Sequence, residues 1–398
     1  ISGNLALIIG GVTNIFTTIG TKTGYITATG EYLEIKRGGG VLNATITNIS
    51  VKESTKNNLA RVDYDGTASS LLVEPERTNL ITYSNNFTDS SWTKLGAGTG
   101  STSVVTSNYA ISPDGTQNAT RLVCDLNGGT TTSDQSLIYD LDSSNTSQSI
   151  SIYIKSNTGS NQNIYFANTF GTGDTAIVTS EWQRFEFNHS TSNHTFSLGL
   201  RGNTGADNTA DVLIWAAQSE NGSYPTSYIP TDGGTVTRVQ DQYSKTGISN
   251  LINSEEGTFF LDLALLSGNT NYDLQTSIVL SDGAANNRVL IYSPTTPQNR
   301  YIALIKSEGN TVIQKTIDAT DITLFNKIAV TWKTNEYKIF LNGNPIYSNT
   351  TPTATPIGLN SLFFAAYNST ANPFYGKVKQ LQIFKTALTD PELAILTT

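Results

Sequence analysis

The 398-residue sequence predicts an all-β protein made of tandem antiparallel β-sandwiches, with one short helix near its C-terminal end. Charged residues make up only 14% of the chain and aromatic residues 9%, a composition that is too apolar for a disordered protein. Gly, Ser, Thr and Asn dominate and favour turns. Apolar residues recur with a period of two, which is the spacing of half-buried strands. We expect two or three domains, because the chain is too long for one compact core.

Two segments show this alternation most clearly. Residues 149–155 (Ser-Ile-Ser-Ile-Tyr-Ile-Lys) and 327–332 (Lys-Ile-Ala-Val-Thr-Trp) both place apolar side chains at every second position. Residues 337–341 are a further apolar run, and Asn342-Gly343 follows it directly. Because this pair tolerates positive φ better than others, the sequence predicts a two-residue hairpin turn there.

The single predicted helix lies at the end of the chain. Thr389 stands three residues before Glu392, which is the spacing of a capping box. Pro391 is tolerated in the first turn of a helix, where its missing N–H is not needed.

An apolar triplet with offsets of three and five residues occurs three times. An offset of three breaks strict alternation, so each segment is expected to be a strand with a bulge or a change of face. Three modules closed by similar last strands are the simplest interpretation. The triplets are Ile46, Ile49 and Val51; Val212, Trp215 and Ala217; and Val378, Leu381 and Ile383.

The overall charge and hydropathy exclude two classes of partner. The formal net charge is −8, so a nucleic-acid backbone would be repelled. The apolar run at residues 5–10 is far shorter than the ~20 residues that span a bilayer, and we expect it to be a strand, with no membrane insertion. The chain begins at Ile1, and we expect its natural N-terminus to lie upstream.

Cys124 is the single cysteine, so no intrachain disulfide can form. This fits assembly in a reducing cytoplasm. Cys124 follows an apolar alternation at residues 121–123, which favours an inert buried thiol over a reactive one.

Residues 79–84, followed by Phe87 and Trp92, resemble the opening of jelly-roll carbohydrate-binding modules of the family four and nine type. The resemblance continues at residues 150–155, 181–185 and 212–218. In such modules Trp92 and Trp182 occupy positions that pack the core. The resemblance implies a carbohydrate-binding jelly roll.

Residues 72–80 (Leu-Val-Glu-Pro-Glu-Arg-Thr-Asn-Leu) and 222–231 (Gly-Ser-Tyr-Pro-Thr-Ser-Tyr-Ile-Pro-Thr) resemble segments of modules in bacteriophage tail and fibre proteins. This is the most specific similarity in the chain. It implies a protein of the virion surface.

From about residue 251 the sequence resembles a laminin-G-like or pentraxin-like domain, a group that shares the concanavalin A-like sandwich. The resemblance implies that the last sandwich has this fold, with Trp332 in its core. The segments that carry it are residues 256–259, 329–332, 337–343, 374–378 and 387–393.

The expected domain organisation combines these resemblances with the turn-rich segments near Asn57-Asn58 and residues 231–235, which are linker-like. Residues 45–53 look like the last strand of another carbohydrate-binding-type module. The expected parts are the C-terminal part of a truncated β-sandwich module (1–56), a linker (57–79), a carbohydrate-binding-module-like jelly roll (80–232), a second linker (233–250) and a laminin-G/concanavalin A-like domain (251–398).

No enzyme active site is predicted. Concanavalin A-like folds include glycoside hydrolases, which need two carboxylates that flank the scissile bond. Glu255-Glu256 is followed only by Asp262, at the wrong spacing for such a pair. His189 and His194 lie in polar turns of the preceding module, and two histidines with one cysteine cannot form a structural zinc cluster.

No cofactor is required by these motifs, but calcium remains open because it needs only carboxylates and carbonyls. The candidate ligands are Asp211, Asp273 and Asp282. Single Asp residues in turns are more often caps than ligands.

Sugar binding needs an aromatic ring that meets the apolar face of a pyranose, with polar groups around it. Trp215 follows Ile214 on one predicted strand, so the two side chains must face opposite sides. The candidate ligand-binding residues are Tyr139, Tyr165, Phe170 and Trp215 in the jelly roll, and Tyr272, Tyr292, Tyr301 and Tyr367 in the last domain.

The resemblances favour a bacteriophage fibre or receptor-binding protein that is assembled in the host cytoplasm and acts at the virion surface. It would bind host cell-surface polysaccharide and other virion proteins as a homo-oligomer, for which a trimer is the expectation. Two alternatives stay open: a structural or decorating virion protein without sugar binding, and a bacterial adhesin or accessory carbohydrate-binding protein. The net negative charge favours neutral glycans over polyanionic ones.

Overall fold

The chain divides into two compact units, residues 1–56 and 57–398. The computed structural model describes residues 2–9, 12–16, 33–43, 60–65, 67–141, 148–167, 173–189, 195–266, 276–294, 299–367 and 372–398. The described part of the first unit is a three-stranded antiparallel sheet. Its strands, in spatial order, are β2 (Val12–Phe16), β1 (Ser2–Ile9) and β3 (Leu33–Asn43). The apolar run in residues 5–9 is therefore a strand, as predicted.

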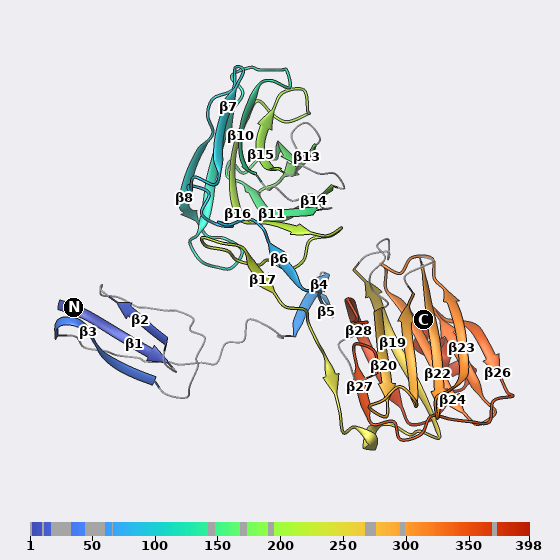
Figure 1. Ribbon diagram of the computed structural model, residues 1–398. Helices are drawn as coiled ribbons and strands as arrows, with labels where there is room; N and C mark the ends of the chain where they lie inside the picture. Colours follow the sequence, from blue (N-terminus) through green and yellow to red (C-terminus); the bar gives the residue numbers. More distant parts are fainter. Residues whose placement is uncertain are drawn as a thin grey trace. The chain divides into compact units, whose positions relative to one another are not determined.

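The first part of the second unit is a sandwich of two five-stranded antiparallel sheets (Figure 1). One sheet has the order β13 (Gly173–Val178), β12 (Gln162–Ala167), β15 (Thr195–Arg201), β10 (Gln135–Leu141) and β7 (Thr93–Ala97). The other has the order β14 (Gln183–His189), β11 (Gln148–Ser156), β16 (Thr209–Asn221), β9 (Ala119–Asp125) and β8 (Val104–Ala110).

Alternate residues of these strands fill the space between the two sheets. Ile150, Ile152 and Ile154 of β11 all lie in this core, which confirms the strand predicted at 149–155. Trp92 is buried there between Phe87 and Phe196, with ring centroids 4.9 Å and 5.3 Å away. Trp182, in contrast, is half-buried and is not part of the core, although the resemblance implied a core position.

The second sandwich of this unit pairs a six-stranded with a seven-stranded antiparallel sheet (Figure 1). The six-stranded sheet has the order β18 (Ser244–Lys245), β27 (Ser361–Phe363), β20 (Thr276–Ser281), β21 (Arg288–Ser293), β22 (Arg300–Ser307) and β23 (Asn310–Asp318). The seven-stranded sheet has the order β26 (Asn344–Asn349), β25 (Tyr337–Leu341), β24 (Asn326–Lys333), β19 (Glu256–Leu265), β28 (Gly376–Phe384), β5 (Ala68–Val73) and β4 (Arg61–Asp65).

The core of this sandwich again follows from period-two burial. Ile328, Val330 and Trp332 of β24 are buried in it, so the strand predicted at 327–332 and the core position of Trp332 are confirmed. The Trp332 indole N–H donates to the Asn253 carbonyl at 3.1 Å, which satisfies the one polar atom of this side chain.

The predicted hairpin and helix are both present. Asn342 and Gly343 have φ angles of 46° and 80° and connect β25 to β26, so this turn needs two residues that tolerate the left-handed region. The helix α1 (Asp390–Thr397) begins with the predicted capping box, in which the Glu392 carboxylate accepts from the Thr389 N–H at 2.8 Å. A short 3₁₀ turn, Ser249–Leu251, precedes β19.

Bulges occur in both of the described strands that carry the apolar triplet. In β16, Trp215 pairs with Tyr153 and Gln218 with Ser151, which leaves an extra residue on β16, and Ala216 has a φ of 60°. In β28, Lys379 is the extra residue between Val378 and Gln380. The bulge prediction is confirmed for these two strands, and the triplet at Ile46 to Val51 lies outside the described residues.

Residues 57–79 and 233–250, which the sequence predicts to be linkers, contribute strands to the sheets. β5 pairs with β28, and β4 pairs with β5 at the edge of the seven-stranded sheet. The chain therefore enters the second sandwich before it builds the jelly roll. It leaves and returns through a two-stranded ribbon of β6 (Arg77–Asn79) and β17 (Val236–Arg238) (Figure 1). Turn-forming residues at these positions end strands and do not exclude them.

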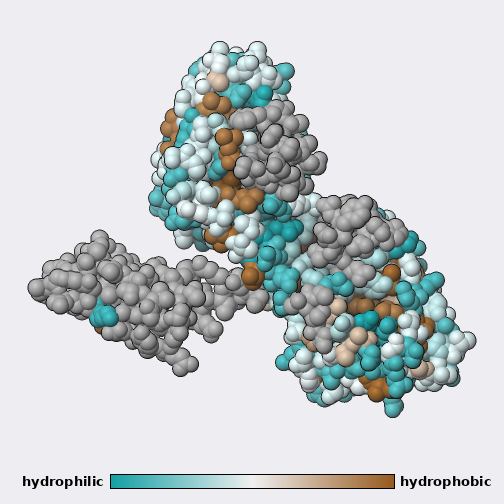
Figure 2. Space-filling model, viewed as in Figure 1, coloured by the Kyte–Doolittle hydropathy of each residue, from teal (hydrophilic) through white to brown (hydrophobic). Residues whose placement is uncertain are grey.

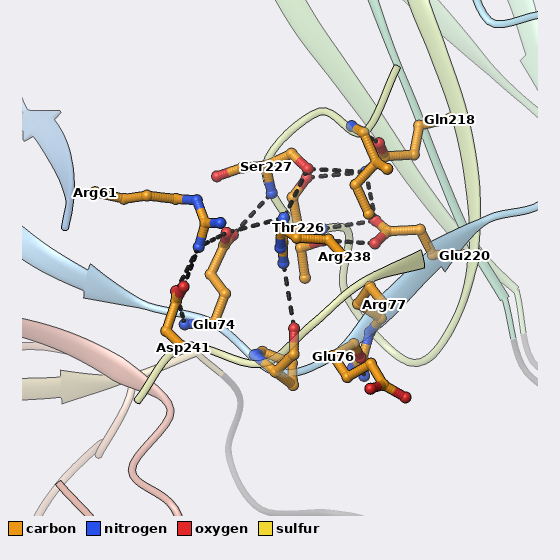
Figure 3. Close-up of polar contacts among 12 residues, drawn as sticks. Arg61, Glu74, Glu76, Arg77, Gln218, Glu220, Thr226, Ser227, Arg238 and Asp241 are labelled. Atoms are coloured by element: carbon orange, nitrogen blue, oxygen red, sulfur yellow. Dashed lines mark hydrogen bonds and ion pairs between the residues drawn. The ribbon is translucent and has the colours of Figure 1, made fainter. Parts of the chain in front are cut away.

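A buried polar network, which we call the joint, surrounds this ribbon (Figure 3). The Glu74 carboxylate lies 3.1 Å from the Arg238 guanidinium and 3.5 Å from that of Arg61, and Arg61 also pairs with Asp241 at 2.5 Å. Glu74 further accepts the Ser227 N–H at 2.8 Å. Four charged groups, of which Arg61 is half-buried and the other three are buried, are thus neutralised pairwise.

A second part of the joint is centred on Glu220, which is fully buried. Its carboxylate accepts the Thr226 N–H at 2.7 Å, the Thr226 hydroxyl at 2.5 Å and the Gln218 amide at 2.7 Å. The Asn79 amide donates to the Ile229 carbonyl at 2.8 Å. Residues 72–80 and 222–231, the segments whose predicted resemblance is to phage modules, therefore meet in this joint.

Candidate functional site

The outer face of the six-stranded sheet, directed away from the core, carries an unusual apolar floor. Val289 and Ile291 point into the core, so Leu290 on the same strand points outward. Leu290 pairs with Val279 on one side and Leu304 on the other, and all three are buried although they face away from the core. Phe363 and Tyr292 pack against them.

Three side chains stand around this floor. Arg288 and Tyr292 are two positions from Leu290 on β21 and share its face. The Arg288 guanidinium lies over the ring of Tyr367, 5.4 Å from its centroid, and all three side chains are half-buried. The structure thus brings together Tyr292 and Tyr367, two of the aromatic residues that the sequence predicts as ligand-binding, and we call this cluster the Arg288 site.

The connection after β27 passes over this face. The Ser281 hydroxyl donates to the Tyr367 carbonyl at 3.0 Å, and the Ser277 hydroxyl donates to the Asn372 carbonyl at 2.9 Å. Both serines lie on the outward side of β20, because Ile278 and Leu280 point into the core. The Ser281 bond holds the Tyr367 backbone against the sheet, and the ring of Tyr367 lies beside Arg288.

Burial changes the ionisation of the site. It lowers the pKa of Arg288, against the opposing effect of Tyr367 and Tyr292, and it raises the pKa of Tyr292. The Arg288 Nε atom is buried and has no hydrogen-bond partner among the described residues. The site therefore combines the neutral phenol of Tyr292 with the charged guanidinium of Arg288, which, among the described residues, still has an N–H free to donate. These groups suit a polar ligand that also has an apolar face.

In the jelly roll, Tyr139 and Tyr165 also share an outward face. Tyr165 pairs with Gly199, and both tyrosines pack with Leu137 in one cluster on the side of the sheet away from the core. Tyr165 is only 1% exposed, and the Arg201 guanidinium covers its ring at 5.8 Å. Its face is therefore closed to a sugar, whereas Tyr139 is half-buried.

Trp215 lies on the outward face of the other jelly-roll sheet, opposite to the core residue Ile214, as strand geometry requires. Its ring packs between Tyr153 and Tyr228, with centroids 5.4 Å and 5.1 Å away. Trp215 is 7% exposed and its indole N–H is buried without an acceptor among the described residues. This arrangement favours a packing role.

The remaining aromatic candidates do not join a site. Tyr301 is 1% exposed within the core of the last sandwich, where its hydroxyl donates to the Ile322 carbonyl at 3.4 Å, so it is not open to a ligand. Phe170 and Tyr272 lie outside the described residues.

The calcium candidates that can be placed have other partners. Both Asp211 carboxylate oxygens accept from the Arg121 guanidinium, at 2.8 Å and 2.7 Å. Asp282 accepts from the Ala284 N–H and the Asn287 amide, both at 2.8 Å, as a turn cap does. Asp273 lies outside the described residues. Among the described residues no three acidic, histidine or cysteine side chains gather where they could hold a metal ion.

Asp262 of β19 is buried and would be the candidate catalytic acid if this domain were a glycosidase. Burial raises its pKa, and the charged groups that oppose this shift are Lys327 and Lys379. A glycosidase acid has a second carboxylate as its partner, and none contributes to this shift.

The face drawn in Figure 2 carries both apolar and hydrophilic side chains. On the jelly roll, brown apolar residues form a stripe on this face, among residues of intermediate and hydrophilic character. None of the described helices has the length and apolar character needed to cross a bilayer.

Comparison with known proteins identifies the last sandwich. Residues 267–394 match the family model of the concanavalin A-like lectin/glucanases superfamily, of the Laminin_G_3 type. A search of curated protein sequences gives no match.

Several solved structures are similar at low sequence identity. The carbohydrate-binding module CBM40 of the Ruminococcus gnavus IT-sialidase, bound to α2,3-sialyllactose, is 17% identical, with 39% of this chain and 98% of that chain covered and a TM-score of 0.32. Domains LG4-5 of the mouse laminin α1 chain are 10% identical, with coverages of 82% and 93% and a TM-score of 0.25. The CBM22 tandem of Paenibacillus barcinonensis Xyn10C is 12% identical, with coverages of 84% and 100% and a TM-score of 0.23.

The family match agrees with the sheet order of the second sandwich. The chain is therefore an all-β protein of tandem antiparallel sandwiches that ends in a concanavalin A-like domain.

Proposed function

We propose that this protein is a lectin-like binding protein that holds glycan at the Arg288 site of its concanavalin A-like domain. The observation that carries the proposal is the convergence of Arg288, Tyr292 and Tyr367 over an apolar floor on one outward sheet face. A pyranose has an apolar face for an aromatic ring and hydroxyls for the surrounding donors and acceptors, and this site offers both.

The protein binds without catalysis in this proposal. A hydrolase of this fold needs a pair of carboxylates, and the described ionisable groups that define this site are Arg288 and two tyrosines. The buried Asp262 lies on β19 of the other sheet. Release of reducing ends from a bound polysaccharide would contradict this part of the proposal.

The biological setting that fits best is the surface of a bacteriophage virion, where the protein would attach to host-cell polysaccharide as a fibre or receptor-binding component. The support is the resemblance of residues 72–80 and 222–231 to modules of phage tail and fibre proteins. Several copies in a symmetric oligomer, with a trimer as the expectation, would raise the avidity of weak sites by about 10²–10⁴.

One observation favours a second role, that of a structural or decorating virion protein. The two phage-like segments build the buried joint through Glu74, Ser227 and Asn79 and do not contribute to the Arg288 site. In this second role the two segments would serve to connect sandwiches and not to bind a ligand. A structural protein would keep the joint and have no glycan ligand.

A glycan microarray probed with the whole chain tests the proposal, with Tyr367→Ala and Tyr292→Ala as variants. Each truncation removes a ring from the site, and we expect the affinity for the bound glycan to fall at least about tenfold, or about 1.4 kcal/mol. Tyr64→Ala is the matched control, because Tyr64 is 70% exposed on the edge strand β4 of the other sheet. An intact chain that binds no glycan would contradict the proposal and favour the structural role.

A further inference from the structure

We infer that the glycan bound at the Arg288 site carries a negatively charged substituent, a carboxylate or a sulfate, which Arg288 and Lys306 bind together. This inference rests on the proposed function and names the class of its ligand. It departs from the expectation, based on net charge, that neutral glycans are favoured. At this site we expect Arg288 and Lys306, and not the net charge of the whole chain, to decide whether acidic or neutral glycans bind.

Arg288 and Lys306 are direct cross-strand neighbours. The register of β21 and β22 places Arg288 opposite Lys306, and both side chains share the outward face with Leu290 and Leu304. Like charges directly opposite each other in a sheet repel and destabilise the pair. An anion bound between the two side chains would relieve this repulsion.

No carboxylate among the described residues neutralises this pair. Among the described residues the Arg288 guanidinium has no ion pair and no hydrogen-bond partner, and its Nε atom is buried. Arg300 on the neighbouring strand β22, unlike Arg288, has an acidic partner, because it pairs with Asp318 of β23 at 2.9 Å. The nearest acidic residue in the turn before β21, Asp282, is committed to Ala284 and Asn287.

The surroundings strengthen the attraction for an anion. Leu290 and Leu304 form an apolar floor, and the Tyr367 ring covers one side of the guanidinium. Charges interact more strongly where water is partly excluded than at an open surface. The planar guanidinium fork matches the two oxygens of a carboxylate or sulfate, and the Lys306 ammonium adds a second point charge.

Aromatic rings then give the site its preference for a sugar over a free anion. Tyr292 is two positions from Leu290 and shares its face. A sugar ring that stacks on Tyr292 would therefore lie within reach of Arg288. A saccharide with its charged substituent toward Arg288 and its apolar face toward Tyr292 or Tyr367 would use every group of the site.

The test uses the whole chain on a microarray that contains acidic oligosaccharides together with their carboxyl-reduced and desulfated counterparts. We expect the bound members to be acidic, and each neutralised counterpart to bind at least about tenfold more weakly. The carboxyl-reduced and desulfated series separate the two anions. We expect binding to weaken as salt rises from 0.05 to about 0.5 M, because ions screen the partly exposed pair.

The variants Arg288→Gln and Lys306→Gln should each abolish the preference for the acidic form. Lys385→Gln is the matched control, since Lys385 is exposed after β28, so it removes one charge without touching the site. Arg288→Lys should restore part of the binding, because it keeps the charge and loses the fork. Each variant is also melted, and we expect Arg288→Gln to be at least as stable as the parent, since it relieves a like-charge pair.

The outcomes separate the two claims. Equal affinity for acidic glycans and their neutralised counterparts would contradict the inference and leave the proposed function standing. Binding to no member of the array would contradict both. A preference for acidic members that survives in Arg288→Gln and Lys306→Gln would also contradict the inference, because the anion would then lie elsewhere.

Discussion

Arg238 of β17 and Glu74 at the end of β5 form a buried ion pair of 3.1 Å, although they lie on opposite sides of the jelly roll in the sequence. The pair joins the strand that leaves the second sandwich to the strand that returns to it. The joint in Figure 3 therefore fixes both passages of the chain at one point. Its stability depends on complete neutralisation, since each of these groups is buried.

Glu74→Gln is expected to destabilise the protein by about 3–5 kcal/mol, because it leaves the guanidinium groups of Arg238 and Arg61 facing a neutral amide. Urea unfolding measured by circular dichroism checks this value. Glu76→Gln is the matched control, since Glu76 is exposed two residues away and should change the stability by less than about 0.5 kcal/mol. Equal stabilities of the two variants would show that the joint is not held by this pair.

Glu220 predicts a dependence of stability on pH. Burial raises its pKa, and hydrogen bonds from Thr226 and Gln218 only partly oppose this effect. The folded protein therefore binds this proton more tightly than the unfolded chain, whose glutamates titrate near pH 4.3. The contribution of Glu220 is complete below that pH and is lost as pH rises through the raised pKa.

The measurement for Glu220 is the free energy of unfolding between pH 4 and about 8, for the parent and for Glu220→Gln. The amide does not titrate, so we expect the stability of the variant relative to the parent to increase with pH. Glu76→Gln is the control for removal of a carboxylate. Curves that stay parallel across this range would contradict the role assigned to Glu220.

Trp215 is expected to act in packing and not in binding. Trp215→Ala should cost about 3–5 kcal/mol, because it removes a ring that is buried between Tyr153 and Tyr228. Trp215→Phe keeps an aromatic ring and removes the buried N–H that lacks an acceptor, so we expect a loss of about 1–2 kcal/mol. A loss of glycan binding in the folded Trp215→Phe variant would make Trp215 a ligand contact instead.

Cys124 should be unreactive while the protein is folded. It is 2% exposed, and burial raises the pKa of its thiol to about 12, so the reactive thiolate is almost absent at pH 8. Iodoacetamide with mass spectrometry should label this cysteine in urea and not in buffer. Rapid labelling of the native protein at pH 8 would show that the thiol is accessible.

The sequence predicts well wherever the signal is local. The Asn342-Gly343 turn, the capping box of Thr389 and Glu392, and the bulges in β16 and β28 depend on residues a few positions apart. Their patterns can be read without knowledge of the rest of the chain. The inert Cys124 follows in the same way from the alternation around it.

Long-range pairing is what the sequence does not disclose. β5 belongs to the sheet of the last sandwich because it pairs with β28, which comes roughly 300 residues later. The turn-forming residues near Asn57-Asn58 give no hint of that partner. The joint was not predicted for the same reason, because Glu74 contacts Ser227 only when residues about 150 positions apart in the chain meet.

The sequence predicted the aromatic residues of the candidate site but not its cations. Tyr292 and Tyr367 were among the aromatic candidates, but nothing in the sequence distinguishes them from the core residue Tyr301. Arg288 and Lys306 were missed, because a cation in a strand is usually a solvated residue. One available signal is the run Arg288 to Tyr292, which is apolar at three consecutive positions and therefore implies that both faces of β21 are covered.

Residue-level footprinting with photogenerated carbenes, with and without a saturating glycan identified on the microarray, tests the central claim most directly. We predict that the bound glycan protects Tyr292, Tyr367 and Arg288 from labelling, while the exposed Tyr64 on the other sheet is labelled equally in both states. Protection confined to the jelly roll, with labelling at the Arg288 site unchanged, would contradict the assignment of glycan binding to this face.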